Sequence, residues 1–139
     1  MLQVVHNQMG HHVWPVHRLD RGTSGCLLFA KTADAVAPLT AALSGGTKRY
    51  LALTRGHWSH PPEHEISAEL ADDRGVLRAA HTRLRCLATS SEPRCSLVLA
   101  QPTTGRTHQI RRHLNRLTHP ILGDSRHGCL LYTSDAADE

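Results

Sequence analysis

Aromatic residues are scarce in this chain: two Trp, two Tyr and one Phe make up 4% of its 139 residues. Proteins that bind single-stranded nucleic acid without sequence preference stack successive bases on several aromatic side chains. The scarcity therefore excludes a stacking platform of that kind. A single tyrosine at a reaction centre would still matter.

Long apolar runs are missing as well. A helix that spans a membrane needs about 20 consecutive apolar residues, and the runs in this sequence are far shorter. No N-terminal pattern of a secretory signal peptide is present either. We therefore expect a soluble, cytoplasmic protein with no membrane partner.

Paired cysteines are absent. The four cysteines lie far apart, at Cys26, Cys86, Cys95 and Cys129. Zinc ribbons require closely spaced cysteine pairs, so this class is excluded, and we expect reduced thiols in an intracellular protein. Cys26 and Cys95 lie in apolar runs, which predicts that both are in the core.

Lysine is rare, because fourteen of the sixteen basic residues are Arg. The net charge is +4 and the sequence pI is about 9.2. Arginine contacts phosphate through two parallel hydrogen bonds, so this composition slightly favours a nucleic-acid partner. The length indicates one domain that is large enough to bury a core.

The most informative segment is HRLDRGTSG at residues 17–25, in which Asp20 lies between Arg18 and Arg21. Glycine, threonine and serine after the acid predict a tight turn, and residues 26–30 predict a short buried strand. The neighbouring arginines favour the ionised carboxylate. Asp20 is therefore a candidate nucleophile or base, or else a structural acid that caps a turn and pairs with an arginine.

A second candidate residue is Tyr50, in a strand predicted over residues 48–54. Alternation places Tyr50, Ala52 and Thr54 on one face and the two leucines, Leu51 and Leu53, on the other. We expect the leucines to face the core and Tyr50 to face the opposite side. There it would line a cleft or pack under a loop.

A helix is predicted over residues 104–117, with Thr107 as its N-cap. Its apolar stripe consists of Ile110, Leu114 and Leu117. Arg111 lies at the border of this stripe, and a half-buried arginine requires a carboxylate partner. Arg112 and Arg116 fall on another face, where they could contact phosphate.

The remaining elements are a helix and several short strands. The helix follows Thr32 and ends at the two glycines 45–46, and the strands are expected at 66–70, 76–79, 81–87 and 95–100. Residues 56–65 are expected to be a loop, and residues 72–75 a hairpin turn. In the strand 81–87, Leu84 and Cys86 should point inward, and Arg83 and Arg85 outward to solvent.

Three ordered blocks of this sequence resemble the RluA family of pseudouridine synthases. They are HRLDRGTSG with the apolar run after it, KRY at 48–50, and TGRTHQIR at 104–111. Residues 8–13 and 112–128 are most similar to the tRNA pseudouridine synthase C branch of that family. The resemblance covers about residues 8–128.

The resemblance implies an α+β fold with a bent, mainly antiparallel mixed sheet and flanking helices. Residues 1–128 would be a pseudouridine synthase catalytic domain, truncated at both ends. Residues 129–139 depart from the family, and we expect them to be a non-native or atypical tail.

The resemblance also implies roles for individual residues. Asp20 would be the catalytic carboxylate, Tyr50 the tyrosine that stacks on the uracil, and Arg111 the partner of Asp20. The RNA contacts would come from Arg18, Arg21, Lys48, Arg106 and Arg112. Isomerisation involves no redox step, so no cofactor is expected. The substrate would be one uridine of tRNA, uridine 65 in this branch, and the enzyme a monomer without an obligate protein partner.

Three alternatives stay open. The chain could be a ribosomal-RNA pseudouridine synthase, or an inactive RNA-binding fragment that lacks terminal strands. The histidines at 6, 11, 12 and 17 could indicate a metal-binding module. They lack the ligand spacing and carboxylate or cysteine support of a metal site, so no metal is predicted.

Overall fold

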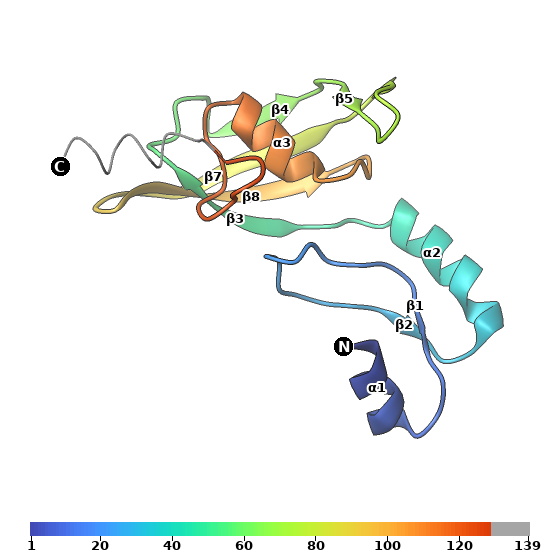
Figure 1. The fold of residues 1–139 in the computed structure, drawn as a ribbon. Helices are drawn as coiled ribbons and strands as arrows, with labels where there is room; N and C mark the ends of the chain where they lie inside the picture. The colour runs from blue at the N-terminus through green and yellow to red at the C-terminus, as the bar shows by residue number, and fades with distance from the viewer. Residues whose placement is uncertain (129–139) are drawn as a thin grey trace. The chain divides into compact units, whose positions relative to one another are not determined.

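The computed structural model describes residues 1–128; the predicted tail at 129–139 lies outside the described residues. Backbone contacts divide the chain into two compact units, Met1–Thr47 and Lys48–Glu139 (Figure 1). Among the described residues, no helix is both long and apolar enough to cross a bilayer. The assignment of residues 1–128 to one domain stays a prediction.

The first unit consists of a hairpin and short helices. Helix α1 (Leu2–Met9) precedes strand β1 (Trp14–Pro15), which pairs antiparallel with β2 (Phe29–Ala30). A 3-10 turn, η1 (Ala33–Ala35), then leads into helix α2 (Val36–Gly45). The helix predicted before the two glycines is thus confirmed. The buried apolar residues of this unit are Val13 and Ala30.

The predicted buried strand over 26–30 is wrong for most of its length. Only Phe29 and Ala30 form β2, and Cys26 is exposed instead of lying in the core. Among residues 1–128, the apolar run is the second arm of a two-stranded hairpin, and a sheet of two short strands buries few side chains. Cys95 is buried as predicted.

The second unit contains a four-stranded antiparallel sheet in the order β3-β8-β7-β4. Its strands are β3 (Tyr50–Arg55), β4 (Glu63–Ile66), β7 (Thr82–Ser91) and β8 (Arg94–Pro102). A small hairpin of β5 (Leu70–Ala71) and β6 (Leu77–Arg78) accompanies it, and helix α3 (Gln109–Arg116) packs against β7 and β8 (Figure 1). Together with the helices, this arrangement agrees with the predicted α+β class.

Two local predictions about the sheet meet different outcomes. Alternation in β7 is confirmed at Leu84, which is buried, and at Arg83 and Arg85, which are exposed, whereas Cys86 is only half-buried. These arginines pair with Glu65 and Glu63 of the neighbouring strand, at 3.0 and 3.7 Å.

The loop predicted over 56–65 is wrong at its end, because β4 begins at Glu63 and residues 63–66 lie opposite 82–85 of β7.

The predicted inner face of β3 is also wrong. Ala52 and Thr54 are buried, whereas Leu51 and Leu53 are 66% and 46% exposed. The buried core that Ala52 joins consists of Ala52, Ile66, Leu84, Val98, Ala100 and Leu114. Tyr50 shares the face of Ala52 and Thr54, as predicted, but it is partly buried against the core, so that face is the inner one. The reason is that α3 and its Leu114 pack on the face that carries the small residues.

A chain of buried polar groups joins α3 to β7. The ring of His113 is fully buried: its Nδ1 lies 2.8 Å from the Thr82 hydroxyl and its Nε2 lies 2.9 Å from the Ala68 carbonyl. The carbonyl can only accept, so Nε2 carries the proton and Nδ1 accepts from Thr82. Gln109 in turn donates to the Thr82 oxygen at 2.9 Å. Each buried group thus has a partner, which fixes how α3 lies on the sheet.

Leucine-to-alanine substitutions test the corrected face of β3. We expect Leu114→Ala to lower the free energy of unfolding by about 2–5 kcal/mol, because it leaves a cavity in the core. Leu51→Ala should change it by no more than about 0.5 kcal/mol, as is usual for exposed sites. Urea unfolding measures both values. A Leu51→Ala cost as large as that of Leu114→Ala would contradict the assigned face.

The buried His113 predicts a stability that depends on pH. Burial lowers its pKa below the ordinary value of 6.5, so the unfolded chain binds a proton at a higher pH than the folded chain does. This contribution is complete above about pH 6.5 and is lost as the pH falls below it, by up to about 1.4 kcal/mol per pH unit. His113→Gln should reduce the pH dependence measured by urea unfolding between about pH 7.5 and 5.5. The exposed His57→Gln is the control, and an equal reduction there would refute the assignment.

Candidate active site

The acid motif forms the connecting loop of the β1–β2 hairpin. Backbone pairing continues past the strands, because the Val16 N–H donates to the Leu28 carbonyl at 3.0 Å. The His17 ring extends it, since its Nε2 accepts the Leu28 N–H at 3.1 Å. Residues between His17 and Leu28 therefore form a loop with a closed base.

Asp20 lies within this loop and begins a tight turn. Its carbonyl accepts the Thr23 N–H at 2.9 Å, as the turn residues predicted. Asp20 itself is half-buried, whereas Arg18 and Arg21 are exposed. Gly25 has a φ of 147°, a backbone conformation that side chains disfavour. The loop thus presents one half-buried carboxylate beside two exposed guanidinium groups.

Tyr50 and Lys48 belong to the second unit. Tyr50 opens β3 opposite Ala100 of β8, and its ring packs at the edge of the core beside that strand. Lys48 lies two residues before the strand and is half-buried. Tyr50 is therefore held by a sheet position, which is a more rigid support than a loop.

The start of α3 is organised by a side chain within the helix. The Oε1 of Gln109 accepts the Thr104 hydroxyl at 2.6 Å and the Arg106 N–H at 3.1 Å. Its Nε2 donates to the His81 carbonyl at 2.9 Å. The predicted cap at Thr107 is wrong, because the N-cap is His108, in a left-handed conformation with φ 53°. Gln109 binds the preceding turn instead, and thereby fixes where the helix begins.

Arg111 forms a two-bond fork with Asp124. Its Nε lies 2.7 Å from Oδ2 and its Nη2 lies 2.8 Å from Oδ1. The side chains are only 22% and 6% exposed, respectively. The sequence correctly predicted that Arg111 needs a carboxylate, and the structure gives Asp124 as one. Asp20 belongs to the other unit, and its pairing with Arg111 stays a prediction.

Asp124 also holds the loop that contains it. Its Oδ1 accepts the backbone N–H groups of Arg126 and His127 at 3.1 and 3.0 Å. The hydrogen bonds from Arg111, followed by those from the backbone, keep the pKa of the Asp124 carboxyl well below its ordinary value despite its burial. The side chain is therefore an anion throughout the physiological pH range.

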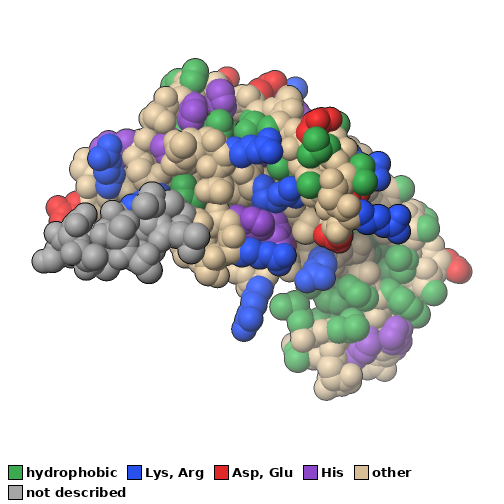
Figure 2. Space-filling view, turned by 45° about the horizontal axis from the view of Figure 1, so that its top comes forward, with side chains coloured by type: hydrophobic (Ala, Val, Ile, Leu, Met, Phe, Trp, Pro, Cys, Tyr) green, Lys and Arg blue, Asp and Glu red, His purple; other side chains and the backbone are tan. Residues whose placement is uncertain are grey.

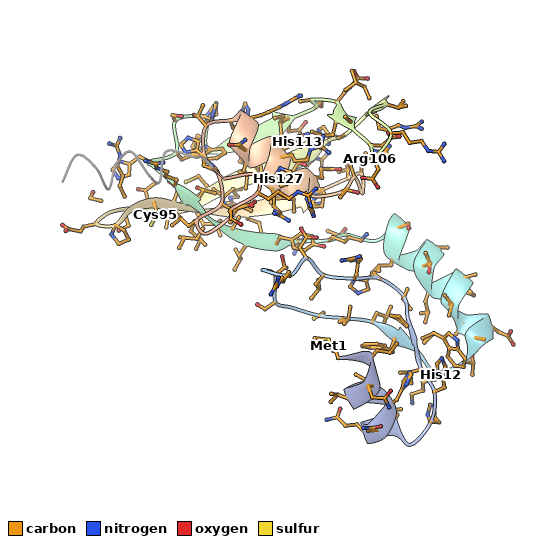
Figure 3. The ribbon with its side chains drawn as sticks, in the orientation of Figure 1. Met1, His12, Cys95, Arg106, His113 and His127 are labelled. Carbon is orange, nitrogen blue, oxygen red and sulfur yellow. The ribbon has the colours of Figure 1, made fainter. Side chains whose placement is uncertain are left out.

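His127 completes this cluster. Its Nε2 lies 2.8 Å from Nδ1 of His108, the N-cap of α3. Burial, and then the nearby charge of Arg111, lower the pKa of His127 below 6.5. Figure 3 labels His127 and Arg106 in the loops on either side of α3. Arg111, Asp124, His127 and His108 thus form one contiguous polar group.

Two of the predicted RNA-contacting arginines also bind the protein itself. Arg106 donates through Nε to the Ala79 carbonyl at 2.9 Å. Arg112 donates through Nη1 to the Ala71 carbonyl of β5 at 3.0 Å. Arg106 is exposed and Arg112 half-buried. Through these hydrogen bonds both arginines help to anchor α3 and its entry loop to the segment around the β5–β6 hairpin. On the surface that Figure 2 displays, Lys and Arg side chains lie close to histidines.

Sequence reasoning missed Asp124 and His127 as site residues. Both lie in the block 112–128 that suggested a particular family branch, but no periodicity marks them. The signal that could have found Asp124 was the need of Arg111 for an anion within the same unit. Within residues 1–128, no group of three or more His, Cys, Asp and Glu side chains is arranged to hold a metal ion.

Comparison with known proteins agrees with the sequence motifs. The family profile described as RNA pseudouridylate synthase matches residues 2–116. The chain is 37% identical to tRNA pseudouridine synthase C of Pasteurella multocida, over 94% of this chain and 62% of that protein. It is 38% identical to the protein of the same name from Salmonella typhi, over 99% of this chain and 61% of that protein. The chain thus spans less than two thirds of the length of these relatives.

Solved structures give the same result for the fold. Human RNA Pseudouridylate Synthase Domain Containing 1 matches with a TM-score of 0.82 and 28% identity, over 94% of this chain and 61% of that one. Human RNA Pseudouridylate Synthase Domain Containing 4, with a TM-score of 0.77 and 24% identity, supports the fold alone. From its profile match and its relatives, the chain belongs to the RNA pseudouridylate synthase family.

Proposed function

We propose that this protein is a pseudouridine synthase that isomerises one uridine of a tRNA, with uridine 65 as the target. The observation that carries the proposal is the likeness to tRNA pseudouridine synthase C, at 38% identity over 99% of the chain. We also propose that it acts in the cytoplasm, because its relatives are named as tRNA-modifying enzymes. It would act as a monomer and need no cofactor.

The reaction moves the ribose from one atom of uracil to another. The bond between the ribose and N1 breaks, the uracil turns, and a bond between the ribose and C5 forms. The proton on C5 leaves and N1 gains a proton, so atoms and charge balance without an oxidant. A carboxylate is needed to act on the sugar or on the ring, and Asp20 is our candidate for it.

Asp20 suits this role because of its local geometry. The closed base of the hairpin and the turn to Thr23 hold the backbone around the acid. The half-buried side chain is screened from water more than a surface acid would be. Arg18 and Arg21, which flank it and are exposed, would bind the RNA backbone. Arg18 would also enter the space that the flipped base leaves.

Tyr50 and Arg111 would complete the reaction centre. Tyr50 would stack on the uracil, which fits a ring held at the start of a strand. Stacking is the better supported role because an ordinary tyrosine hydroxyl is a weak base for taking a proton. Arg111 would orient Asp20 and balance its charge. Its fork with Asp124 fixes the plane of the guanidinium group before any substrate binds.

RNA binding would rest on charge and shape. Lys48, Arg106 and Arg112 would add contacts to the phosphates approached by Arg18 and Arg21. The target base must leave its helix, and its unstacking must be offset by contacts in the pocket. Recognition of an RNA fold would depend on its shape and its exposed bases.

Substitution of the proposed catalytic acid tests the function. Asp20→Asn should abolish pseudouridine formation and leave tRNA binding within about threefold, because the amide keeps the shape but cannot act as a nucleophile or base. Tritium release from tRNA labelled at uridine C5 measures the reaction, and filter binding measures affinity. The exposed Asp34→Asn is the control. Appreciable residual turnover would remove Asp20 from its role.

Arg111→Met should impair both activity and folding. It leaves the ionised Asp124 buried without its fork, and we expect a loss of about 3 kcal/mol in the free energy of unfolding at pH 7. The pKa of Asp124 is lowered in the folded wild type, so the stabilisation is present above about pH 4 and lost as the pH falls below it. The difference between variant and wild type should therefore shrink at about pH 3 in urea unfolding. Arg85→Met, at an exposed pair, is the control, and a pH-independent loss for Arg111→Met would contradict the analysis.

Wild-type activity separates this proposal from its alternatives. Pseudouridine in ribosomal RNA and none in tRNA would indicate the ribosomal enzyme. Salt-sensitive RNA binding without any isomerisation would indicate an RNA-binding fragment.

A further inference from the structure

We propose that Asp124 is a positioning residue, which sets the orientation of Arg111 for catalysis and couples it to the loop 124–128. The proposal rests on the proposed function, because it assigns the task of orienting a group of that reaction centre. It concerns a residue outside the three motif blocks.

The first argument is the geometry of the fork. Two bonds of 2.7 and 2.8 Å join one edge of the guanidinium group to both carboxylate oxygens. A single hydrogen bond would let the group turn about it, but two parallel bonds fix its plane and direction. Because Nε and Nη2 bind Asp124, the direction of the remaining nitrogen of the guanidinium group, Nη1, is fixed as well.

The second argument is that Asp124 is itself held by several contacts. Its side chain is 6% exposed, and Oδ1 also binds the N–H groups of Arg126 and His127. Its own N–H donates to the Ile121 carbonyl at 3.2 Å. At Gly128 the chain returns so closely that an added Cβ would overlap the Asp124 carbonyl oxygen. The carboxylate is thus part of a tightly folded loop, and Arg111 is bound to that loop.

The third argument is a second attachment of the same loop to the same helix. His127 binds His108 at 2.8 Å, three residues before Arg111. His108 is the N-cap of α3, directly before the helical turn that contains Arg111. The loop is therefore joined to the start of α3 at two points, His108 and Arg111, and this second attachment opposes rotation of the loop about the fork.

A double-mutant cycle tests whether Asp124 acts through Arg111. The variants are Asp124→Asn, Arg111→Lys and the two combined, with the exposed Asp73→Asn as the matched control. Activity is measured as kcat and KM for pseudouridine formation on tRNA. A lysine cannot form the fork, so it removes the interaction through which Asp124 would act while keeping the positive charge.

We expect Asp124→Asn to lower kcat by about 100-fold with little change in KM, because misorientation by a fraction of an ångström affects the reacting geometry more than RNA binding. In the Arg111→Lys background the same substitution should cause no further loss of kcat. Asp73→Asn should match the wild type. Losses that multiply in the double variant, or that appear mainly in KM, would overturn the proposal.

Two further measurements keep the test decisive. If Asp124→Asn does not fold, Asp124→Glu keeps the charge, displaces the carboxylate by one methylene, and enters the same cycle.

NMR of protein labelled at arginine nitrogen should show a slowly exchanging Arg111 Nε–H that disappears in Asp124→Asn and persists in Asp73→Asn. Absence of that signal from the wild type would overturn the positioning of Arg111 even in an active enzyme. A wild type without isomerase activity would instead overturn the proposed function, and the NMR signal would still decide whether Asp124 holds Arg111.

Discussion

The structure of the second unit depends on the satisfaction of polar groups buried beneath α3. The Gln109 amide, the Thr82 hydroxyl and the His113 ring each have one arrangement in which all their donors and acceptors are used. Because an unmet buried donor costs as much as several apolar contacts contribute, this arrangement permits little sliding or rotation of the helix. Arg111, two residues after Gln109, inherits its position from that constraint. Neutral groups therefore place the backbone of Arg111, and the fork with Asp124 orients its guanidinium group.

The sequence predicted the fold best where one residue type has only one tolerable environment. The apolar stripe of α3, which packs on the core, is one example. The outward arginines of β7, which pair with Glu63 and Glu65 of the neighbouring strand, are another. It failed at β3, where both faces are acceptable in isolation. Leu51 and Leu53 are more hydrophobic than Ala52 and Thr54, yet α3 approaches the face with small side chains. The packing of the helix on the sheet decides which face of β3 is buried, and the local alternation of residues does not predict it.

The candidate site shows the same division. The need of Arg111 for an anion could be predicted from its position beside an apolar stripe. That Asp124 is this anion could not be predicted, because the loop that contains Asp124 has no periodic sequence pattern. The motif residues themselves are split between the units, with Asp20 in the first and Tyr50 and Arg111 in the second. The proposed chemistry would therefore need residues from both units.

The second unit exposes apolar side chains in two strands, at Leu51 and Leu53 of β3 and at Leu87 of β7, which is 45% exposed. Salts act oppositely on these leucines and on the arginines. Raising the ionic strength weakens contacts between arginine and phosphate, whereas sulfate and phosphate ions strengthen the association of apolar surfaces. Concentrated sulfate would therefore strengthen contacts made by these leucines, and dilute chloride would favour the proposed contacts between arginine and RNA phosphate.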